Sequence, residues 1–266
     1  MTETADFGPV LRYPVVTVKP DDVVHAEQAI ATEIPFTIVA SDVEIATMQC
    51  SPSDLTELCY GFLLSTGFIN TTEEILSCSI DTTRWVAELE LEHVPDLELM
   101  GKRLYTSGCG KGVTYASLDE ASARMPVVSG FSITREQVFE MARWLQRASS
   151  VYRDTRGIHT AALSTDGDTP SITMDDIGRH NAVDKVIGKG LMTGLDFSRT
   201  ALVCSGRVSS EILQKARRAG IAVLVARGAP THQSILRAQD MEITIVGFAR
   251  GTSFTVFTHE ERIELS

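Results

Sequence analysis

After Thr134, short apolar runs typical of strands alternate with amphipathic segments typical of helices. Thr134 and Gln137 form a capping-box pattern that predicts the start of the first helix. Strands joined by helices through short connections pair in parallel with right-handed crossovers, and helices then cover both faces of the sheet. In such sheets a ligand binds beyond the carboxyl ends of the strands. The predicted strands are 160–164, 171–174, 200–204, 221–225, 242–247 and 254–258, and the predicted helices are 135–149, 178–195, 210–219 and 232–239.

The first hundred residues instead have a mixed α+β pattern. Strands are predicted at 15–18, 36–40 and 85–91. Pro52 and Ser53 open a helix with Ser53 as the expected N-cap, and Gly67 lies just past its end. Residues 97–112 are mostly loop-like, so we place a domain boundary there and predict a smaller α+β domain over 1–105 and an α/β domain over 106–266.

The 266 residues carry a formal net charge of −11, which argues against general binding to nucleic acid or to an anionic membrane. No apolar run reaches 18 residues, and the first residues lack the basic and apolar regions of a signal peptide. We therefore expect a cytoplasmic protein that contacts neither membranes nor nucleic acids. A local basic pocket remains compatible with this net charge.

The segment Asp175–Lys185 combines six ionisable side chains with an apolar rhythm that continues past it. The rhythm is helical from about Gly178, so the charges fall on a loop and on the first turns of a helix. Helix N-termini are suited to anions. We expect Arg179, His180 and Asn181 to meet a ligand there, with Asp184 fixing Arg179 or His180 near it. A charged N-terminal turn without a ligand is the alternative.

Two strand-to-helix turns share a design suited to phosphate. Ser205-Gly206-Arg207 follows one predicted strand, and Arg227-Gly228-Ala229-Pro230-Thr231 follows the next. Free backbone N–H groups, an arginine fork and a hydroxyl cap are the groups that bind phosphate or pyrophosphate. Ordinary helix capping is the alternative for either turn alone. Neither turn is a Walker A loop or a Gly-x-Gly-x-x-Gly motif, which disfavours ATP hydrolysis and a standard dinucleotide site.

Two further segments are candidates for ligand contact. His159 starts a predicted strand, where a structural histidine is the common alternative to a functional one. The segment 248–253, Phe-Ala-Arg-Gly-Thr-Ser, links the last two predicted strands. Its aromatic face could stack a base and its arginine could hold a phosphate, or the segment could be a simple hairpin turn.

Five cysteines are scattered without a Cys-x-x-Cys pair or zinc-finger spacing. Cys50, Cys59, Cys78 and Cys204 lie in apolar or β-branched surroundings, so we expect small core residues. Cys109 differs because glycines flank it and Lys111 and Arg103 lie near it in the sequence. Nearby cations lower the pKa of a thiol and enrich the reactive thiolate. A nucleophilic thiol without a fixed base suits sulfur carriage.

The order and spacing of these motifs resemble those of the formate dehydrogenase accessory sulfurtransferases, the FdhD/NarQ family. The resemblance is carried by Leu58–Ile69, by Gly157–Ala162, by Asp175–Lys185, by Ser205–Lys215, by Ala229–Thr231 and by Gly247–Gly251. It implies a sulfurtransferase that passes persulfide sulfur from a cysteine desulfurase to the molybdenum bis(molybdopterin guanine dinucleotide) cofactor of formate dehydrogenase. It also implies a cytidine-deaminase-like three-layer C-terminal domain and a homodimer.

On this resemblance Cys109 is the catalytic persulfide carrier. The chain lacks the His-x-Glu and Pro-Cys-x-x-Cys motifs of working deaminases, so no zinc or other metal site is expected. The residues expected to contact the molybdenum cofactor are His159, Arg179, His180, Asn181, Asp184, Lys185, Ser205, Gly206, Arg207, Thr231, Phe248, Ala249, Arg250, Gly251, Thr252 and Ser253.

The chain departs from the family at its cysteine loop. The family typically has Thr-Ser-x-Cys-Gly-x-Cys-Gly, whereas this chain has Thr106-Ser-Gly-Cys-Gly-Lys-Gly112. Alignment on Thr-Ser-x-Cys-Gly makes Cys109 the first cysteine, and a shift by three residues makes it the second. Either way the loop has no second thiol. This leaves open a single-cysteine carrier and, alternatively, a non-catalytic chaperone that binds and delivers the molybdenum cofactor.

Overall fold

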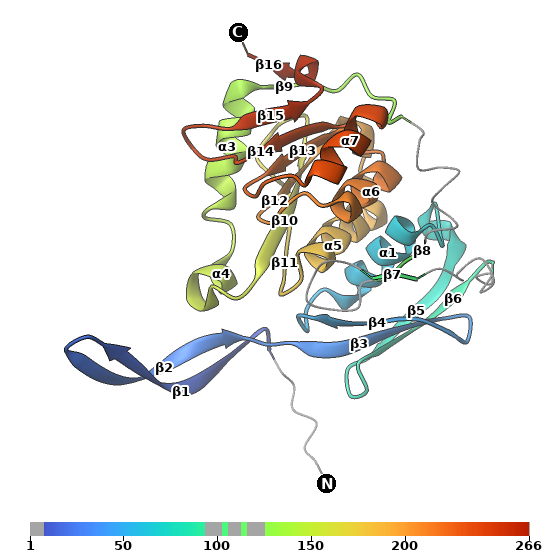
Figure 1. Ribbon diagram of the computed structural model, residues 1–266. Helices are drawn as coiled ribbons and strands as arrows, with labels where there is room; N and C mark the ends of the chain where they lie inside the picture. Colours follow the sequence, from blue (N-terminus) through green and yellow to red (C-terminus); the bar gives the residue numbers. More distant parts are fainter. Residues whose placement is uncertain (1–7, 94–102, 106–112, 116–125, 266) are drawn as a thin grey trace.

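A computed structural model describes residues 8–93 and 126–265, together with the backbone of two short strands at 103–105 and 113–115 (Figure 1). The protein is a mixed α/β structure whose largest sheet has six strands in the order β11-β10-β12-β13-β14-β15. Those strands are β10 (His159–Thr165), β11 (Ile172–Asp176), β12 (Thr200–Cys204), β13 (Val223–Ala226), β14 (Thr244–Gly247) and β15 (Thr255–Thr258).

The prediction of parallel pairing is right for the centre of this sheet and wrong for its sides. β12, β13 and β14 pair in parallel, whereas β10 runs antiparallel to both β11 and β12, and β15 runs antiparallel to β14. The reason for the first difference is the connection after β10. Asp166 and Gly167 both take left-handed backbone conformations, and the chain turns back directly into β11 without a crossover helix.

Helices cover both faces of the six-stranded sheet, as expected. One face carries α5 (Arg179–Met192), α6 (Ser210–Ala219) and α7 (His232–Asp240), and the other carries α3 (Arg135–Leu145). Strand residues alternate between the two cores: Leu202 and Leu224 join the first, and Val203 and Val225 join the second. The sheet is therefore buried on both faces, and its exposed groups lie at the ends of its strands.

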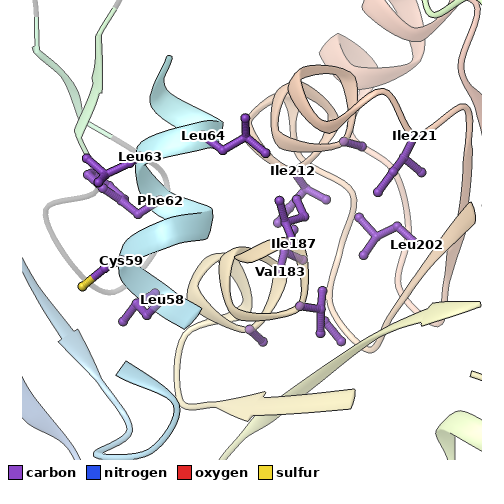
Figure 2. Close-up of a cluster of buried hydrophobic side chains, with 14 of the residues drawn as sticks. Leu58, Cys59, Phe62, Leu63, Leu64, Val183, Ile187, Leu202, Ile212 and Ile221 are labelled. Atoms are coloured by element: carbon purple, nitrogen blue, oxygen red, sulfur yellow. The ribbon is translucent and has the colours of Figure 1, made fainter. Parts of the chain in front are cut away.

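A second layer of structure packs on the outer side of α5. A four-stranded sheet has the order β4-β3-β6-β5, and helix α1 lies between this sheet and α5 (Figure 1). Figure 2 shows α1 beside α5 and α6, with Val183 and Ile187 of α5 in the shared core. These elements are β3 (Ile34–Ala40), β4 (Val43–Cys50), α1 (Leu55–Thr66), β5 (Ile75–Asp81) and β6 (Val86–Leu91).

Two glycines allow α1 and α5 to touch. A Cβ added at Gly61 would lie 1.8 Å from the backbone oxygen of Asp184, and one at Gly188 would lie 1.9 Å from the oxygen of Glu57. Because any side chain at these positions would meet backbone, the helices can approach this closely only through glycine. This contact fixes α5, whose first turn carries candidate site residues.

Local end signals in the sequence predicted several boundaries correctly. Thr134 and Gln137 form the expected capping box, Thr231 caps α7, and Gly220 ends α6 in a left-handed conformation. Two predictions were wrong. Asp54, not Ser53, is the N-cap of α1, and the helix that starts at Arg135 ends at Leu145 rather than near Ser149. Ser149 instead caps a separate short helix, α4 (Ser150–Thr155).

The first strands form a hairpin that projects from the rest of the protein below α4 (Figure 1). Among the residues that the structure describes, β1 (Val10–Lys19) and β2 (Asp22–Ala31) pair only with each other. In the described part of the chain, no helix is long and apolar enough to cross a membrane. The remaining elements are β7 (Arg103–Tyr105), β8 (Val113–Tyr115), β9 (Ile133–Thr134), β16 (Ile263–Glu264) and the short 3₁₀ helices at 72–74, 197–199 and 260–262.

Candidate functional site

Most of the predicted site residues gather at one edge of the six-stranded sheet. The carboxyl ends of β12, β13 and β14 meet there because these strands are parallel. The start of β10 and the end of β11 reach the same edge, since His159 pairs with Asp176 in antiparallel register. Helices α5, α6 and α7 all begin at this edge. The two strand-to-helix turns therefore lie close together, because β12 and β13 are neighbouring parallel strands.

The turns after β12 and β13 are joined through their backbones. Val208 N donates to Ala229 O at 3.1 Å, and Thr231 N donates to Val208 O at 3.0 Å. A Cβ at Gly228 would lie only 2.5 Å from the oxygen of Gly206. The glycines therefore let two turns form one continuous surface of backbone and polar side chains.

The loop after β14 completes this surface. Arg250 Nη1 donates to the backbone oxygens of Arg227 at 2.6 Å and of Ala249 at 2.9 Å, so it ties two turns together. Phe248 has a left-handed backbone and is 48% exposed, with its ring centroid 6.0 Å from that of Phe257. An exposed ring held by a neighbouring ring is suited to stacking a planar group.

Ser205 connects β10 to the turn after β12. Its Oγ lies 3.2 Å from His159 Nδ1 and accepts a hydrogen bond from Thr160 N at 3.0 Å. Burial lowers the pKa of His159, and the positive charge of Arg179 lowers it further. The imidazole is therefore neutral at pH 7, and His159 is held in place by Ser205.

His180 forms a second polar cluster at the start of α5. Its Nε2 lies 3.2 Å from Ser209 Oγ and 3.1 Å from Glu211 Oε2. Burial, followed by the charges of Lys215 and Arg179, lowers the pKa of His180 to about 3. Burial raises the pKa of Glu211. Because the imidazole is neutral at pH 7, its contact with Glu211 is a hydrogen bond rather than an ion pair.

Positive charge is concentrated at this edge although the whole chain is acidic. Arg179, Arg207, Arg227 and Arg250 come from the start of α5 and from the three turns, and Arg207 is exposed. Arg156, at the end of α4, adds a fifth guanidinium. Arginines beside backbone N–H groups and helix N-termini are the usual means of binding phosphate. The geometry thus fits an anionic ligand.

A cavity of about 350 Å³ opens beside the turn after β12. The sequence pointed to three of its lining residues, His159, Ser205 and Arg227 of the second turn, and missed Tyr152 and Arg156. The guanidinium of Arg156 lies 5.5 Å from the ring centre of Tyr152. Tyr152 and Arg156 are four residues apart, a spacing that places two side chains on one face of a helix. This spacing was the available signal in the sequence, but the helix α4 itself was not predicted. The cavity offers an aromatic face and two cations next to the arginine-rich edge.

Three residues predicted to meet the ligand are instead bound to other parts of the protein. Lys185 is completely buried, with its Nζ 2.7 Å from Asp176 Oδ2. Asp184 is also buried; it pairs with Lys215 at 2.7 Å and accepts a hydrogen bond from Ser65 at 2.7 Å. Asn181 Nδ2 donates to Gln49 O at 2.8 Å. Asp184 is thus held by Lys215 of α6 and Ser65 of α1, and the expectation that it fixes Arg179 or His180 stays a prediction.

These buried groups hold the start of α5. Asp176 is fully buried and accepts hydrogen bonds from Ser51 N at 3.0 Å and Gly178 N at 2.7 Å, besides the contact with Lys185. The strand β4 and the start of α5 are thereby joined through one carboxylate. The charged segment that looked like a ligand site in the sequence has two functions in the structure: Arg179 and His180 face the edge, and the rest anchor the helix.

The remaining predicted positions lie on the edge or support it. Thr231 Oγ1 accepts a hydrogen bond from Ser234 N at 3.3 Å, so its hydroxyl serves as a helix cap. Ala249 is buried, and Thr252 and Ser253 are exposed. Gly251 O accepts a hydrogen bond from Arg143 at 3.4 Å.

The cysteines divide as follows. Cys109 lies outside the described residues. Cys50, Cys59 and Cys204 are buried as expected, and burial raises the pKa of Cys50 and of Cys204 to about 12. Cys78 is only half-buried, and its thiol shares a hydrogen bond with that of Cys59, a pairing that the sequence did not indicate. Within the described residues no His, Cys, Asp and Glu side chains group as metal ligands.

Comparison with known proteins gives one consistent result. The chain is 38% identical over 257 residues to the sulfur carrier protein FdhD of Staphylococcus aureus strain MRSA252, covering 95% of this chain and 96% of that protein. It is 37% identical over 247 residues to the sulfur carrier protein FdhD of Bacillus licheniformis, covering 92% and 94%.

A solved structure shares the fold. The crystal structure of a protein described as a formate dehydrogenase accessory protein, from Desulfotalea psychrophila, superposes with a TM-score of 0.77 at 22% identity. The alignment covers 96% of this chain and 99% of that one. The FdhD/NarQ family profile matches residues 31–264, which include every segment of the arginine-rich edge. The chain belongs to the FdhD/NarQ family.

Proposed function

We propose that this protein is a cytoplasmic sulfur carrier required for formate dehydrogenase activity. Sulfur reaches it as a persulfide from a cysteine desulfurase and passes to the molybdenum bis(molybdopterin guanine dinucleotide) cofactor. The observation that carries the proposal is the family match over residues 31–264 together with relatives of nearly equal length that are named sulfur carrier proteins. The C-terminal part would have the cytidine-deaminase-like arrangement of this family, and the protein would act as a homodimer.

The arginine-rich edge supports the cofactor part of this proposal. A molybdopterin guanine dinucleotide carries a pyrophosphate and a planar base, and the edge presents arginines, backbone turns and the exposed ring of Phe248. Arg207 would meet the pyrophosphate directly. Arg250 would act by holding the turn of Arg227, since its guanidinium is bound to backbone oxygens.

Cys109 would carry the sulfur. In the loading step its thiolate attacks the outer sulfur of the desulfurase persulfide; a new S–S bond forms at Cys109 and the desulfurase thiolate leaves. No external oxidant is needed, because the sulfur atom is exchanged between thiolates. The described cysteines are poorer candidates, since burial raises the pKa of Cys50 and Cys204 and thus disfavours their thiolates.

A chaperone that binds and delivers the cofactor without carrying sulfur is the second candidate. The single cysteine in the segment 106–112 favours it, because a two-cysteine relay is unavailable in that loop. Both candidates use the same arginine-rich edge, and they differ only in whether Cys109 is needed.

The deciding experiment replaces Cys109 by alanine. In cells whose own accessory gene is deleted, we expect Cys109→Ala to abolish the activity of a co-expressed formate dehydrogenase while guanine nucleotide binding stays at the wild-type level. Cys204→Ala is the matched control, because its thiol is buried in the core and its loss should cost only stability.

A second measurement tests loading directly. After incubation with a cysteine desulfurase and cysteine, the wild-type mass should rise by one sulfur atom that mild reduction removes, and Cys109→Ala should show no such gain. If Cys109→Ala restores dehydrogenase activity as well as the wild type does, the carrier function is wrong and the chaperone function replaces it.

A further inference from the structure

Two cysteines that the proposed function does not use lie together between α1 and β5. Cys78 of β5 pairs with Leu89 of β6, and directly opposite residues of an antiparallel pair have their side chains on the same face. Leu89 is buried in the core that α1 also joins, so the side chain of Cys78 faces α1. The thiols of Cys59 and Cys78 share a hydrogen bond there.

The position of Cys59 on α1 agrees with this contact. Cys59 and Gly61 are two residues apart, which places them about 200° apart around a helix of 3.6 residues per turn. Gly61 contacts the backbone of α5, so Cys59 lies on the opposite face of α1. Figure 2 shows the sulfur of Cys59 pointing away from Val183 and Ile187 of α5. Helix and sheet therefore bring the two thiols together from segments that are separate in the sequence.

The two thiols differ in their access to solvent. Cys59 is completely buried, whereas Cys78 is half-buried between the exposed Ser77 and Ser79. In the four-stranded sheet that the structure describes, β5 is an edge strand. A small reagent that approaches this edge therefore meets the sulfur of Cys78 before that of Cys59.

The hydrogen bond also gives the two thiols different reactivities. It lowers the pKa of Cys78, although burial opposes this shift. Burial raises the pKa of Cys59, and the contact with Cys78 raises it further. Because the thiolate is the nucleophilic form, Cys78 is the more reactive sulfur, with a protonated thiol held beside it. A reactive thiolate next to a second thiol is the arrangement in which oxidation ends in a disulfide.

We propose that Cys59 and Cys78 form a thiol–disulfide site that hydrogen peroxide oxidises and a dithiol reduces. First, the Cys78 thiolate attacks a peroxide oxygen; an S–O bond forms, the O–O bond breaks, and hydroxide leaves with the proton that Cys78 released. Then the sulfur of Cys59 attacks the sulfenic acid; an S–S bond forms, the S–O bond breaks, and the thiol proton leaves with the hydroxyl group as water. Two thiols are oxidised, and one hydrogen peroxide is reduced to two waters.

This inference goes beyond the proposed function and does not depend on sulfur transfer, because Cys109 takes part in neither step. The disulfide would join α1 to the edge strand of the four-stranded sheet. The opposite face of α1 carries the contact with α5 at Gly61. Oxidation would therefore fix to the sheet the helix against which α5 packs.

The first test maps the disulfide in the full-length Cys109→Ala variant, which removes a thiol whose own oxidation would complicate the result. The protein is treated with hydrogen peroxide, its free thiols are alkylated, and its peptides are analysed without reduction. We expect a linked peptide that joins Cys59 to Cys78 and a protein mass lower by two hydrogen atoms, both reversed by dithiothreitol. Before oxidation, brief alkylation of the folded protein should label Cys78 at least about tenfold faster than Cys59.

The second test separates the two thiols in the same Cys109→Ala background. Cys59→Ala keeps the reactive sulfur without its partner, so a sulfenic acid at Cys78 should persist and be trapped by dimedone. Cys78→Ala should lose both the disulfide and the fast alkylation. Cys204→Ala is the matched control, because its buried thiol lies in β12, and it should form the disulfide at the rate of its parent. Circular dichroism shows whether each variant has kept its fold.

The mapping requires no change at Cys59 or Cys78, so a variant that fails to fold leaves the first test intact. Recovery of both as free thiols, under peroxide conditions that oxidise glutathione, would overturn the proposal. So would a disulfide from Cys78 to Cys50, or one that forms only in urea. None of these results bears on the Cys109 assay in cells.

Discussion

Arg207 and Arg250 occupy turns at the same edge of the sheet, and the structure gives them different functions. Arg207 is exposed, whereas Arg250 donates to the backbone oxygens of Arg227 and Ala249. We expect Arg207→Ala to weaken guanine nucleotide binding by about tenfold to a hundredfold without changing the melting temperature, because a charge-assisted bond contributes about 1.5–3 kcal/mol.

Arg250→Ala should weaken nucleotide binding and also lower the melting temperature, since it leaves two backbone carbonyls without their donor. Isothermal titration and thermal unfolding of the two variants measure the contrast. Unchanged titration curves for both would remove the ligand assignment.

His180 predicts a pH dependence of stability. Its pKa is lowered to about 3 in the folded protein by burial and by Lys215 and Arg179, with His159 and Glu211 also nearby. The unfolded chain has a histidine pKa near 6.5, so it binds the proton more readily. The contribution of His180 to the free energy of unfolding is therefore fully present above about pH 6.5. It falls as the pH drops toward 3, by up to about 1.4 kcal/mol per pH unit.

The measurement is urea unfolding of the wild type and of His180→Gln between pH 4 and pH 7.5. We expect the stability of the wild type to fall relative to that of the variant as the pH drops. The difference between the two proteins isolates His180, because Glu211 titrates in both. A difference that is constant over the range would contradict the burial of a neutral imidazole.

At the scale of elements, α5 is fixed by two buried ion pairs that the sequence did not predict. Asp184 on α5 pairs with Lys215 on α6 and accepts a hydrogen bond from Ser65 on α1. Burial raises the pKa of Asp184, and Lys215 opposes that shift. We expect Asp184→Ala to destabilise the protein by about 3–5 kcal/mol, because it leaves the Lys215 ammonium buried without its counter-charge.

The double variant Asp184→Leu with Lys215→Met removes both charges and should recover most of this loss. Chemical unfolding of the single and double variants measures it. An Asp184→Ala protein with wild-type stability would show that the carboxylate is solvated, contrary to its burial.

The contrast between α6 and α5 shows which elements the sequence could predict. The helix predicted at 210–219 matches α6, whose caps Ser209 and Gly220 are neighbouring residues in the sequence. The function of Asp184 and Lys185 depends on Lys215, Ser51 and other groups far along the chain. In the sequence, charged residues at the start of a helix form the same pattern whether their side chains face a ligand or the protein interior. The turns of the site were predictable because parallel strands bring their carboxyl ends to one edge, whereas the cavity needed α4, which has a weak pattern.

At the scale of the whole molecule, one core spans both predicted domains. The same cluster contains Phe36 and Ile38 of the four-stranded sheet, Leu58 of α1 and Leu202 of the six-stranded sheet. We expect both parts to unfold in one cooperative transition.

The two tryptophans allow a direct test. Trp85 lies beside the four-stranded sheet and Trp144 lies on α3, on the far face of the six-stranded sheet. Fluorescence of the Trp85→Phe and Trp144→Phe variants, each followed against its own circular dichroism, should give coincident midpoints. Separate midpoints within one variant would show two independently folding units.

The position of α1 between two sheets has a consequence for how the chain is made. Translation proceeds at about 5–20 residues per second, so about 6–25 s pass between synthesis of the end of α1 at Thr66 and the end of α5 at Met192. Throughout this interval the face of α1 that carries Gly61 has no α5 to pack against, and the leucines of α1 remain exposed to other chains. The N-terminal segment is thus most exposed to aggregation while the chain is still being synthesised. The yield of the protein in cells should therefore depend on factors that shield unfinished polypeptides on the ribosome.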